Sequence, residues 1–213
     1  MDAIVFDWDG TLVDSLPAIY DANRQVLAEY DLPFDSERYR AAYVPDWRLM
    51  YQRLGIPDHA LDAAGARWLE LYRLAGNAAL LPRITESLQR LSAAGFVMGL
   101  VTAGHRDVVN AQVEEFGLGA LIPYRVFGSD DIATKPHPAP LLRVIDQLGR
   151  SHRIATARYV GDVPDDMRMA RAVGTLGIGI ESTIGARDDL VAAGATAVYP
   201  GVAEFVDDLL GSP

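Results

Sequence analysis

The chain has 213 residues and half of them are apolar, enough to bury the core of one large domain or of one domain with a small insertion. A formal net charge of −10 leaves no general basic surface for a phosphate backbone, which argues against nucleic acid as a partner. The absence of cysteine excludes disulfides, thiolate metal sites and a cysteine nucleophile.

The apolar start of the chain is interrupted early by Asp7 and Asp9. The run is too short for a signal peptide or for a helix that crosses a bilayer. Together with the missing cysteines, this predicts a cytoplasmic protein without a membrane partner.

Short apolar runs recur along most of the chain. The first, residues 4–6, is continuous and ends in an Asp-x-Asp-Gly turn, a pattern typical of a buried parallel strand. Similar runs predict strands over residues 97–102, 124–128, 158–162, 176–180 and 197–199.

Between most of these strands lies a segment of helical periodicity that stops at a glycine. Residues 107–116 place Val109 and Val113 on one face and precede Gly117, a suitable C-cap. The same pattern predicts helices over residues 87–94, 141–148, 167–173 and 187–193, ending before Gly95, Gly149, Gly174 and Gly194. The alternation predicts an α/β fold with a Rossmann-like, three-layer parallel-sheet core.

Residues 16–80 break this alternation. They are rich in Ala, Leu, Tyr and Arg at helical spacing, are punctuated by prolines, and contain no convincing strand. We therefore expect a small helical domain, inserted into a core formed by residues 1–15 and 81–213.

Polar residues gather where the predicted strands end, which is where parallel α/β sheets bind ligands. These residues are Asp7, Asp9, Thr102, Asp162 and, one helical turn later, Asp166. Lys135 lies in a proline-rich loop, residues 134–138, which we expect to be extended. Converging carboxylates repel one another and need a cation, and all-oxygen ligands predict Mg²⁺. Mg²⁺ beside a lysine and a threonine hydroxyl would bind a dianionic group such as phosphate.

The order of these residues resembles the four motifs of the haloacid dehalogenase superfamily. They are Asp-Trp-Asp-Gly-Thr-Leu-Val-Asp-Ser at 7–15, Thr102, Lys135 followed by Pro136, and Gly-Asp-Val-Pro-Asp-Asp at 161–166. The chain is similar to the phosphoglycolate phosphatase-like branch, whose helical cap follows the first motif. The resemblance covers nearly the whole chain, including Lys-Pro-His-Pro-Ala-Pro at 135–140.

The resemblance implies a role for each motif residue. Asp7 would attack phosphorus and form an aspartyl-phosphate, while Asp9 would protonate the leaving oxygen and then activate water. Thr102 would bind phosphoryl oxygens and Lys135 would neutralise charge. Mg²⁺ would be held by Asp7, the Asp9 carbonyl and Asp162, with Asp166 binding through water or orienting the ligands.

The substrate contacts are expected to include the segment Thr102, Ala103 and Gly104, together with Lys135 and, from the cap, Arg48. Ala103 stands where relatives commonly have Asn, so one phosphate contact would be either missing or replaced by backbone amides. Arg83 stands where many relatives have Gly after the proline that returns from the cap.

The leading hypothesis is a hydrolase of a small phosphomonoester, either phosphoglycolate-like or a sugar phosphate, with no particular oligomeric state implied. A phosphosugar mutase related to β-phosphoglucomutase is the alternative, although residues 15–80 carry no recognisable mutase signature. A non-catalytic phosphate-binding module resembling a receiver domain fits the order of motifs less well. Asp9 argues against dehalogenases, which lack an acid there, and against phosphonate-cleaving relatives, which usually have Ala.

Overall fold

The computed structural model describes residues 1–75 and 78–211. Contacts divide the chain into two compact units. The core unit comprises Met1–Asp14 and Leu80–Pro213, and the helical unit comprises Ser15–Ala79. None of the described helices is long and apolar enough to cross a membrane.

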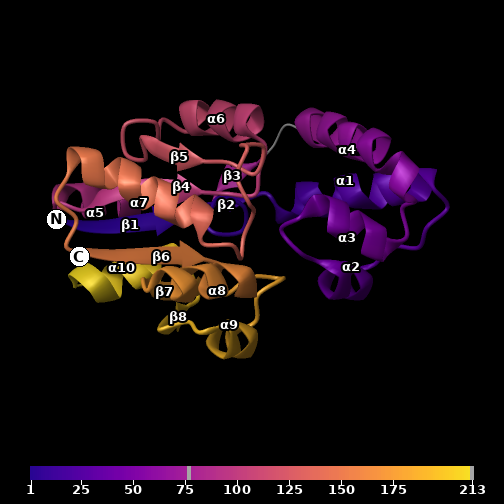
Figure 1. Cartoon of the computed structure of the whole chain (residues 1–213). Helices are drawn as coiled ribbons and strands as arrows, with labels where there is room; N and C mark the ends of the chain where they lie inside the picture. The colour runs from indigo at the N-terminus through magenta and orange to yellow at the C-terminus, as the bar shows by residue number, and fades with distance from the viewer. Residues whose placement is uncertain (76–77, 212–213) are drawn as a thin grey trace. The chain divides into compact units, whose positions relative to one another are not determined.

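Six parallel strands form the sheet of the core unit, in the order β5-β4-β1-β6-β7-β8 (Figure 1). Their bounds are β1 Asp2–Phe6, β4 Val97–Val101, β5 Tyr124–Val126, β6 Thr156–Gly161, β7 Leu176–Ile180 and β8 Ala197–Tyr199. After β1 the chain builds β4 and β5 on one side of it and then β6 to β8 on the other. The strand order therefore reverses at β1, the position where such sheets bind ligands.

Helices cover both faces of this sheet, and the predicted α/β class with its parallel core is confirmed. On one face lie α7 (Ala139–Ser151), α8 (Pro164–Val173) and α9 (Arg187–Ala193), and on the other α5 (Ile84–Ala93) and α10 (Val202–Leu210) (Figure 1). Helix α6 (Arg106–Glu115) follows β4. Alternate strand residues pack beneath α7, with Ala3 and Val5 of β1 in the same buried cluster as Leu141 and Val144.

The helical unit contains α1 (Leu16–Glu29), α2 (Ser36–Ala42), α3 (Trp47–Leu54), a 3-10 turn η1 (Asp58–Ala60) and α4 (Leu61–Ala75). Aspartates begin two of these helices, because the Asp35 carboxylate accepts from Arg38 N and the Asp46 carboxylate accepts from Arg48 N. Helix α1 packs on α4, and α3 contacts both α2 and α4.

Three features of the fold differ from the sequence prediction. Helix α7 continues through Gly149 to Ser151, because one glycine in an exposed last turn costs only about 1 kcal/mol. Helix α10 was not predicted, although it buries Val202, Phe205 and Val206. A two-residue strand β3 (Ala79–Leu80) pairs with β2 (Val13–Asp14) where no strand was expected.

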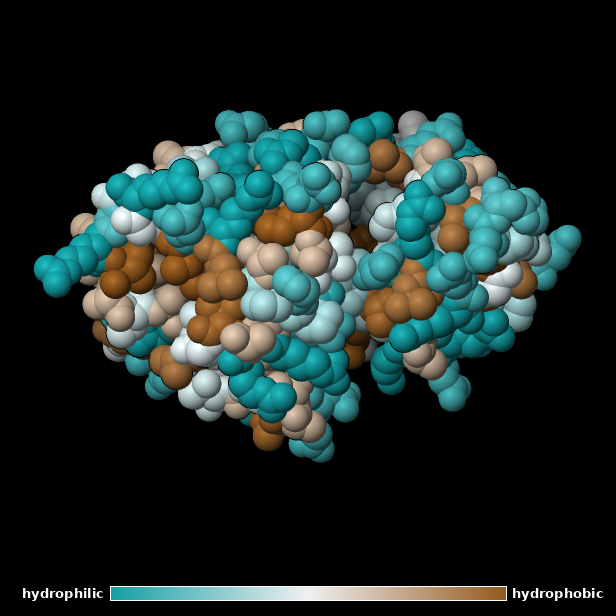
Figure 2. Space-filling view, viewed as in Figure 1, coloured by the Kyte–Doolittle hydropathy of each residue, from teal (hydrophilic) through white to brown (hydrophobic). Residues whose placement is uncertain are grey.

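The surface is mostly hydrophilic on the face drawn in Figure 2, with separate hydrophobic patches. The exposed large apolar side chains of the described residues are Met1, Trp47, Leu49, Leu142, Leu176 and Val191. Trp47 and Leu49 share α3, and the others are scattered over the core unit, which is ordinary for a protein surface.

Candidate active site

Three neighbouring strands end at the candidate site. Strand β1 lies between β4 and β6, and the residue that follows each strand is polar: Asp7, Thr102 and Asp162, respectively. All three side chains are buried. The register of the parallel strands therefore brings together Asp7 and Asp162, which are 155 positions apart in the sequence.

Lys135 connects two of the carboxylates. Its Nζ lies 2.7 Å from Asp7 Oδ1 and 2.9 Å from Asp166 Oδ1, and the side chain is 3% exposed. The sequence predicted an extended loop around Lys135, and this prediction is wrong. The Lys135–Pro136 peptide bond is cis, and His137 N donates to Thr134 O in a turn.

Asp166 is held by three groups. Its Oδ2 accepts from Val163 N at 3.1 Å, closing a capping box at the start of α8. Its Oδ1 lies 3.2 Å from the Tyr159 hydroxyl in addition to Lys135. This arrangement orients Asp166 toward the lysine.

Sequence reasoning missed Tyr159 and the role of Gly161. Both point from β6 toward α8, and a Cβ on Gly161 would lie 2.3 Å from Asp166 Oδ2, so only glycine leaves room for that carboxylate. The Tyr159 hydroxyl also lies 3.0 Å from Val101 O. The available signal was the period of two along β6, which places Tyr159 on the same face as Gly161.

Burial and charge shift the pKa values at the site. Burial raises the pKa of Asp7 to about 7, with Lys135 opposing the shift and Asp166 adding to it. Burial and the neighbouring Asp7 also raise the pKa of Asp162. For Lys135, burial favours the neutral amine, but Asp166 and Asp7 outweigh it and raise the pKa.

The acidic cluster fits a hard divalent cation. One carboxylate oxygen from each of Asp7, Asp162 and Asp166 lies within 4.8 Å of the others. A single lysine neutralises only part of their charge, and Asp162 Oδ2 is buried without a hydrogen-bond partner among the described residues. An all-oxygen set with an orphaned carboxylate oxygen suits Mg²⁺.

The loop after β1 presents Asp9. Trp8 O accepts from the amides of Thr11, Leu12 and Val13, and Gly10 adopts a φ of 75° that completes the tight loop. The Thr11 hydroxyl lies 3.4 Å from Asp162 Oδ1, so this loop also contacts the acidic cluster.

Thr102 and Asp9 lie close to each other around Gly104. A Cβ on Gly104 would be 3.1 Å from Thr102 Oγ1 and 3.4 Å from Asp9 Oδ2. Gly104 N donates to Thr102 Oγ1 at 2.9 Å. The structure therefore brings Asp7, Asp9, Thr102, Gly104, Lys135, Asp162 and Asp166 to one end of the sheet.

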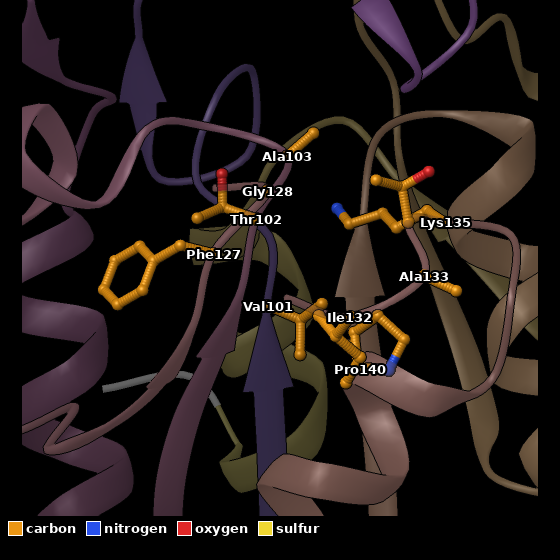
Figure 3. Close-up of a pocket in the computed structure, with 10 residues that line it drawn as sticks. Val101, Thr102, Ala103, Phe127, Gly128, Ile132, Ala133, Lys135 and Pro140 are labelled. Carbon is orange, nitrogen blue, oxygen red and sulfur yellow. The ribbon is translucent and has the colours of Figure 1, made fainter. Parts of the chain in front are cut away.

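A pocket opens beside Thr102 and Lys135. It spans about 230 Å³ of space that no protein atom fills, part of it open to solvent, and is lined mainly by apolar groups, including Val101, Ile132 and Pro140. Figure 3 shows the Lys135 amine directed across the pocket toward Thr102, with Ala103 and Gly128 nearby.

Arg48 belongs to the helical unit, where it pairs with Asp62. Its Cζ atom also lies 4.7 Å from the centroid of the Trp47 ring. These contacts lie within the helical unit, and a substrate contact of Arg48 stays a prediction.

Comparison with known proteins places this geometry in a family. A family model described as haloacid dehalogenase-like hydrolase matches residues 1–174. A phosphoglycolate phosphatase of Rhodospirillum rubrum is 36% identical, over 99% of this chain and 91% of that protein. The chain therefore belongs to the haloacid dehalogenase-like hydrolase family. Within that family it is a phosphatase, as the resemblance of its motifs predicted.

Solved structures share the fold over both units. A haloacid dehalogenase-like family protein of Streptococcus pneumoniae has a TM-score of 0.81 and 24% identity, covering 98% of each chain. A Thermotoga maritima structure, provisionally named a β-phosphoglucomutase, has a TM-score of 0.74 and 22% identity with the same coverage. The fold alone therefore does not separate hydrolases from mutases.

Proposed function

We propose that the chain is a Mg²⁺-dependent phosphatase that hydrolyses a small phosphomonoester through an aspartyl-phosphate on Asp7. The observation that carries this proposal is the setting of Asp7. It follows the central strand, Lys135 Nζ holds one of its oxygens at 2.7 Å, and Asp162 and Asp166 lie beside it.

The reaction takes place in two displacements. In the first, an Asp7 carboxylate oxygen attacks phosphorus in line, the bond from phosphorus to the ester oxygen breaks, and Asp9 gives its proton to the leaving alcohol. In the second, Asp9 takes a proton from a water that attacks the same phosphorus. The bond from phosphorus to Asp7 then breaks, which releases phosphate and restores both carboxyl groups to their starting states.

The remaining site residues bind and orient. Thr102 donates to a phosphoryl oxygen, and the backbone of Ala103 and Gly104 lines the same side. Lys135 lies between the nucleophile and Asp166, so it holds Asp7 in place and offsets charge on the transferring group. Val163 N and the Tyr159 hydroxyl fix Asp166 in place, which supports a role for Asp166 in orienting Lys135.

Asp7, the Asp9 carbonyl and Asp162 would hold Mg²⁺, and the orphaned Asp162 Oδ2 supports this assignment. When bound, the ion supplies positive charge to the phosphoryl oxygens and offsets the repulsion between carboxylates. Asp166 would remain outside the direct ligands because both of its oxygens have partners within the protein.

Substrate choice is assigned to the helical unit acting as a cap, with Arg48 as a contact for an anionic group. Phosphoglycolate is the leading substrate, because a phosphatase for it is 36% identical over almost the whole chain. Sugar phosphates, nucleoside monophosphates and pyrophosphate follow.

The test is phosphate release from a panel of these phosphate compounds, measured with Mg²⁺ and with EDTA. Asp7→Asn is the mechanistic variant, and Asp146→Asn, on the exposed side of α7, is the matched control. We expect metal-dependent release by wild type and the control, and none by Asp7→Asn. Isomerisation of sugar phosphates without release would favour the mutase, and neither activity would leave a binding role.

A further inference from the structure

The segment that carries Thr102 is braced by the turn that follows β5. Gly128 N donates to Gly104 O at 3.1 Å, and Arg106 N donates to Ser129 Oγ at 3.0 Å. The two backbones are so close that a Cβ on Gly128 would lie 2.0 Å from Ala103 O. Residues 127–130 therefore pack directly against residues 102–106.

An ion pair closes this contact on its outer side. Arg106 donates to Asp130 Oδ1 from Nε at 3.1 Å and from Nη2 at 2.5 Å. The Arg106 guanidinium also lies over the Phe127 ring, with Cζ 4.4 Å from its centroid. Arginine is thus fixed by an anion and an aromatic face together.

Asp130 binds both sides of the junction at once. While Oδ1 accepts from Arg106, Oδ2 accepts from Phe127 N at 3.2 Å, and the side chain is only 8% exposed. A carboxylate shielded from water interacts more strongly than an exposed one. Asp130 therefore ties the start of α6 to the end of β5.

Gly104 connects the turn after β5 to Thr102, the expected phosphate-binding residue. Gly104 O is held by Gly128, and Gly104 N donates to Thr102 Oγ1 at 2.9 Å. A threonine hydroxyl has one proton and two acceptor sites. Since Oγ1 already accepts from Gly104, its proton is directed away from that amide, which leaves it available to a phosphoryl oxygen.

We propose that Arg106 and Asp130 are positioning residues for Thr102, acting through Gly128 and Gly104. The proposal rests on the proposed phosphatase function and extends it to a pair that touches neither substrate nor metal. The methyl group of Ala103 makes no hydrogen bond, so the orientation of this segment depends on its neighbours. A displacement of about 1 Å can cost up to about a hundredfold in rate.

The experiment compares Asp130→Ala, Arg106→Gln and a control, Asp146→Ala, which breaks an exposed ion pair with Arg150 on α7. The readouts are kcat, KM, Tm and the Kd of inorganic phosphate with Mg²⁺ by calorimetry. Thr102 contacts phosphoryl oxygens before and during the reaction, so we expect KM and the phosphate Kd to rise about tenfold in both variants. The fall in kcat should be smaller than this rise. The control should match wild type.

Conservative variants distinguish positioning from general stability. Asn at position 130 can accept from Arg106 or from Phe127 but not from both, so Asp130→Asn should fall between Asp130→Ala and wild type in phosphate Kd. Arg106→Lys keeps the charge and should recover part of the affinity lost in Arg106→Gln. Should Asp130→Ala fail to fold, the half-exposed Arg106 supplies the deciding pair of variants.

A lowered Tm with wild-type KM and phosphate Kd in both truncations would overturn the proposal, because the ion pair would then serve stability alone. Failure of the proposed function is recognised separately. In that case, wild type itself would neither release phosphate nor bind inorganic phosphate with Mg²⁺.

Discussion

The candidate site of the core unit and the surface of the helical unit partner charged side chains in different ways. In the core, Lys135 is 3% exposed and bridges two buried carboxylates that arrive from different elements. In the helical unit, Arg48 and Arg67 pair with carboxylates on the surface, where the side chains are 37–85% exposed. Buried pairs depend on each partner, whereas exposed pairs contribute little to stability.

Two buried tyrosine hydroxyls, one in each unit, give a second comparison. The Tyr159 hydroxyl of the core lies within hydrogen-bond distance of Val101 O and Asp166 Oδ1. In the helical unit, the Asn23 amide, the Tyr51 hydroxyl and Trp68 Nε1 are buried without a hydrogen-bond partner among the described residues. Tyr159 is thus held by partners at the candidate site, whereas the Tyr51 hydroxyl is buried without one in the part of the chain that the structure describes. Unpaired buried atoms are not confined to the helical unit, because Asp162 Oδ2 of the core is another.

The largest effect is expected from Lys135→Met, which leaves Asp7 and Asp166 buried without their cation. Loss of one partner of a buried ion pair costs about 3–5 kcal/mol. Arg67→Met breaks the exposed pairs with Glu29 and Glu70 and is the matched control. Urea unfolding should show a large loss for the first variant only, and phosphate release should fall more than about a hundredfold. Equal stabilities would contradict the distinction between the units.

A pH effect of a few kcal/mol is expected from the carboxyl groups of the core. The pKa of Asp7 is raised to about 7 in the folded protein, whereas an unfolded Asp titrates near 3.9. Between these values the folded state binds more protons than the unfolded one, so the free energy of unfolding of the metal-free protein falls as pH rises.

Mg²⁺ binding to the cluster would compensate for this loss. The gain in Tm from Mg²⁺ should therefore grow between about pH 5 and about pH 8, as scanning calorimetry with and without the ion would measure. The same gain at both pH values would mean that Asp7 is ionised throughout.

Tyr159→Phe and Tyr51→Phe compare the two units at one kind of group. Removing the Tyr159 hydroxyl deprives a buried acceptor of its donor and should cost about 1–3 kcal/mol. The Tyr51 hydroxyl has no hydrogen-bond partner among the described residues, so its removal should be neutral or stabilising. Thermal unfolding of both variants measures the difference. A loss at Tyr51 as large as that at Tyr159 would show an unrecognised partner in the helical unit.

The sequence predicted the strands of the core unit better than the contacts that position the site residues. Continuous apolar runs and helix-ending glycines located all six sheet strands, because buried parallel strands leave a strong local signal. The placement of Lys135 between Asp7 and Asp166 depends on contacts across the sheet, which no local pattern records. Gly149 shows the same limit, since packing of α7 outweighs the preference of glycine for a helix end.

Arg83 is a second case in which tertiary contacts outweigh a local preference. It adopts a φ of 59°, a conformation that favours glycine, and it pairs with Asp207 of α10 and with Glu86. The departure from the glycine common in relatives is thus accompanied by an ion pair between the residue that precedes α5 and a residue of α10, two helices on the same face of the sheet.

The smallest effect on stability is expected from Arg48→Met, and it tests whether the helical unit contributes to substrate binding. Its pair with Asp62 is exposed, so the free energy of unfolding should change by less than about 1 kcal/mol. If Arg48 binds a second anionic group, the substitution should raise KM about tenfold for phosphoglycolate. It should leave KM unchanged for phosphomonoesters such as phenyl phosphate, whose alcohol portion carries no charge. Arg67→Met again serves as control. Equal KM changes for both substrate types would remove Arg48 from the substrate contacts, and the specificity of the cap would then depend on other side chains of the helical unit.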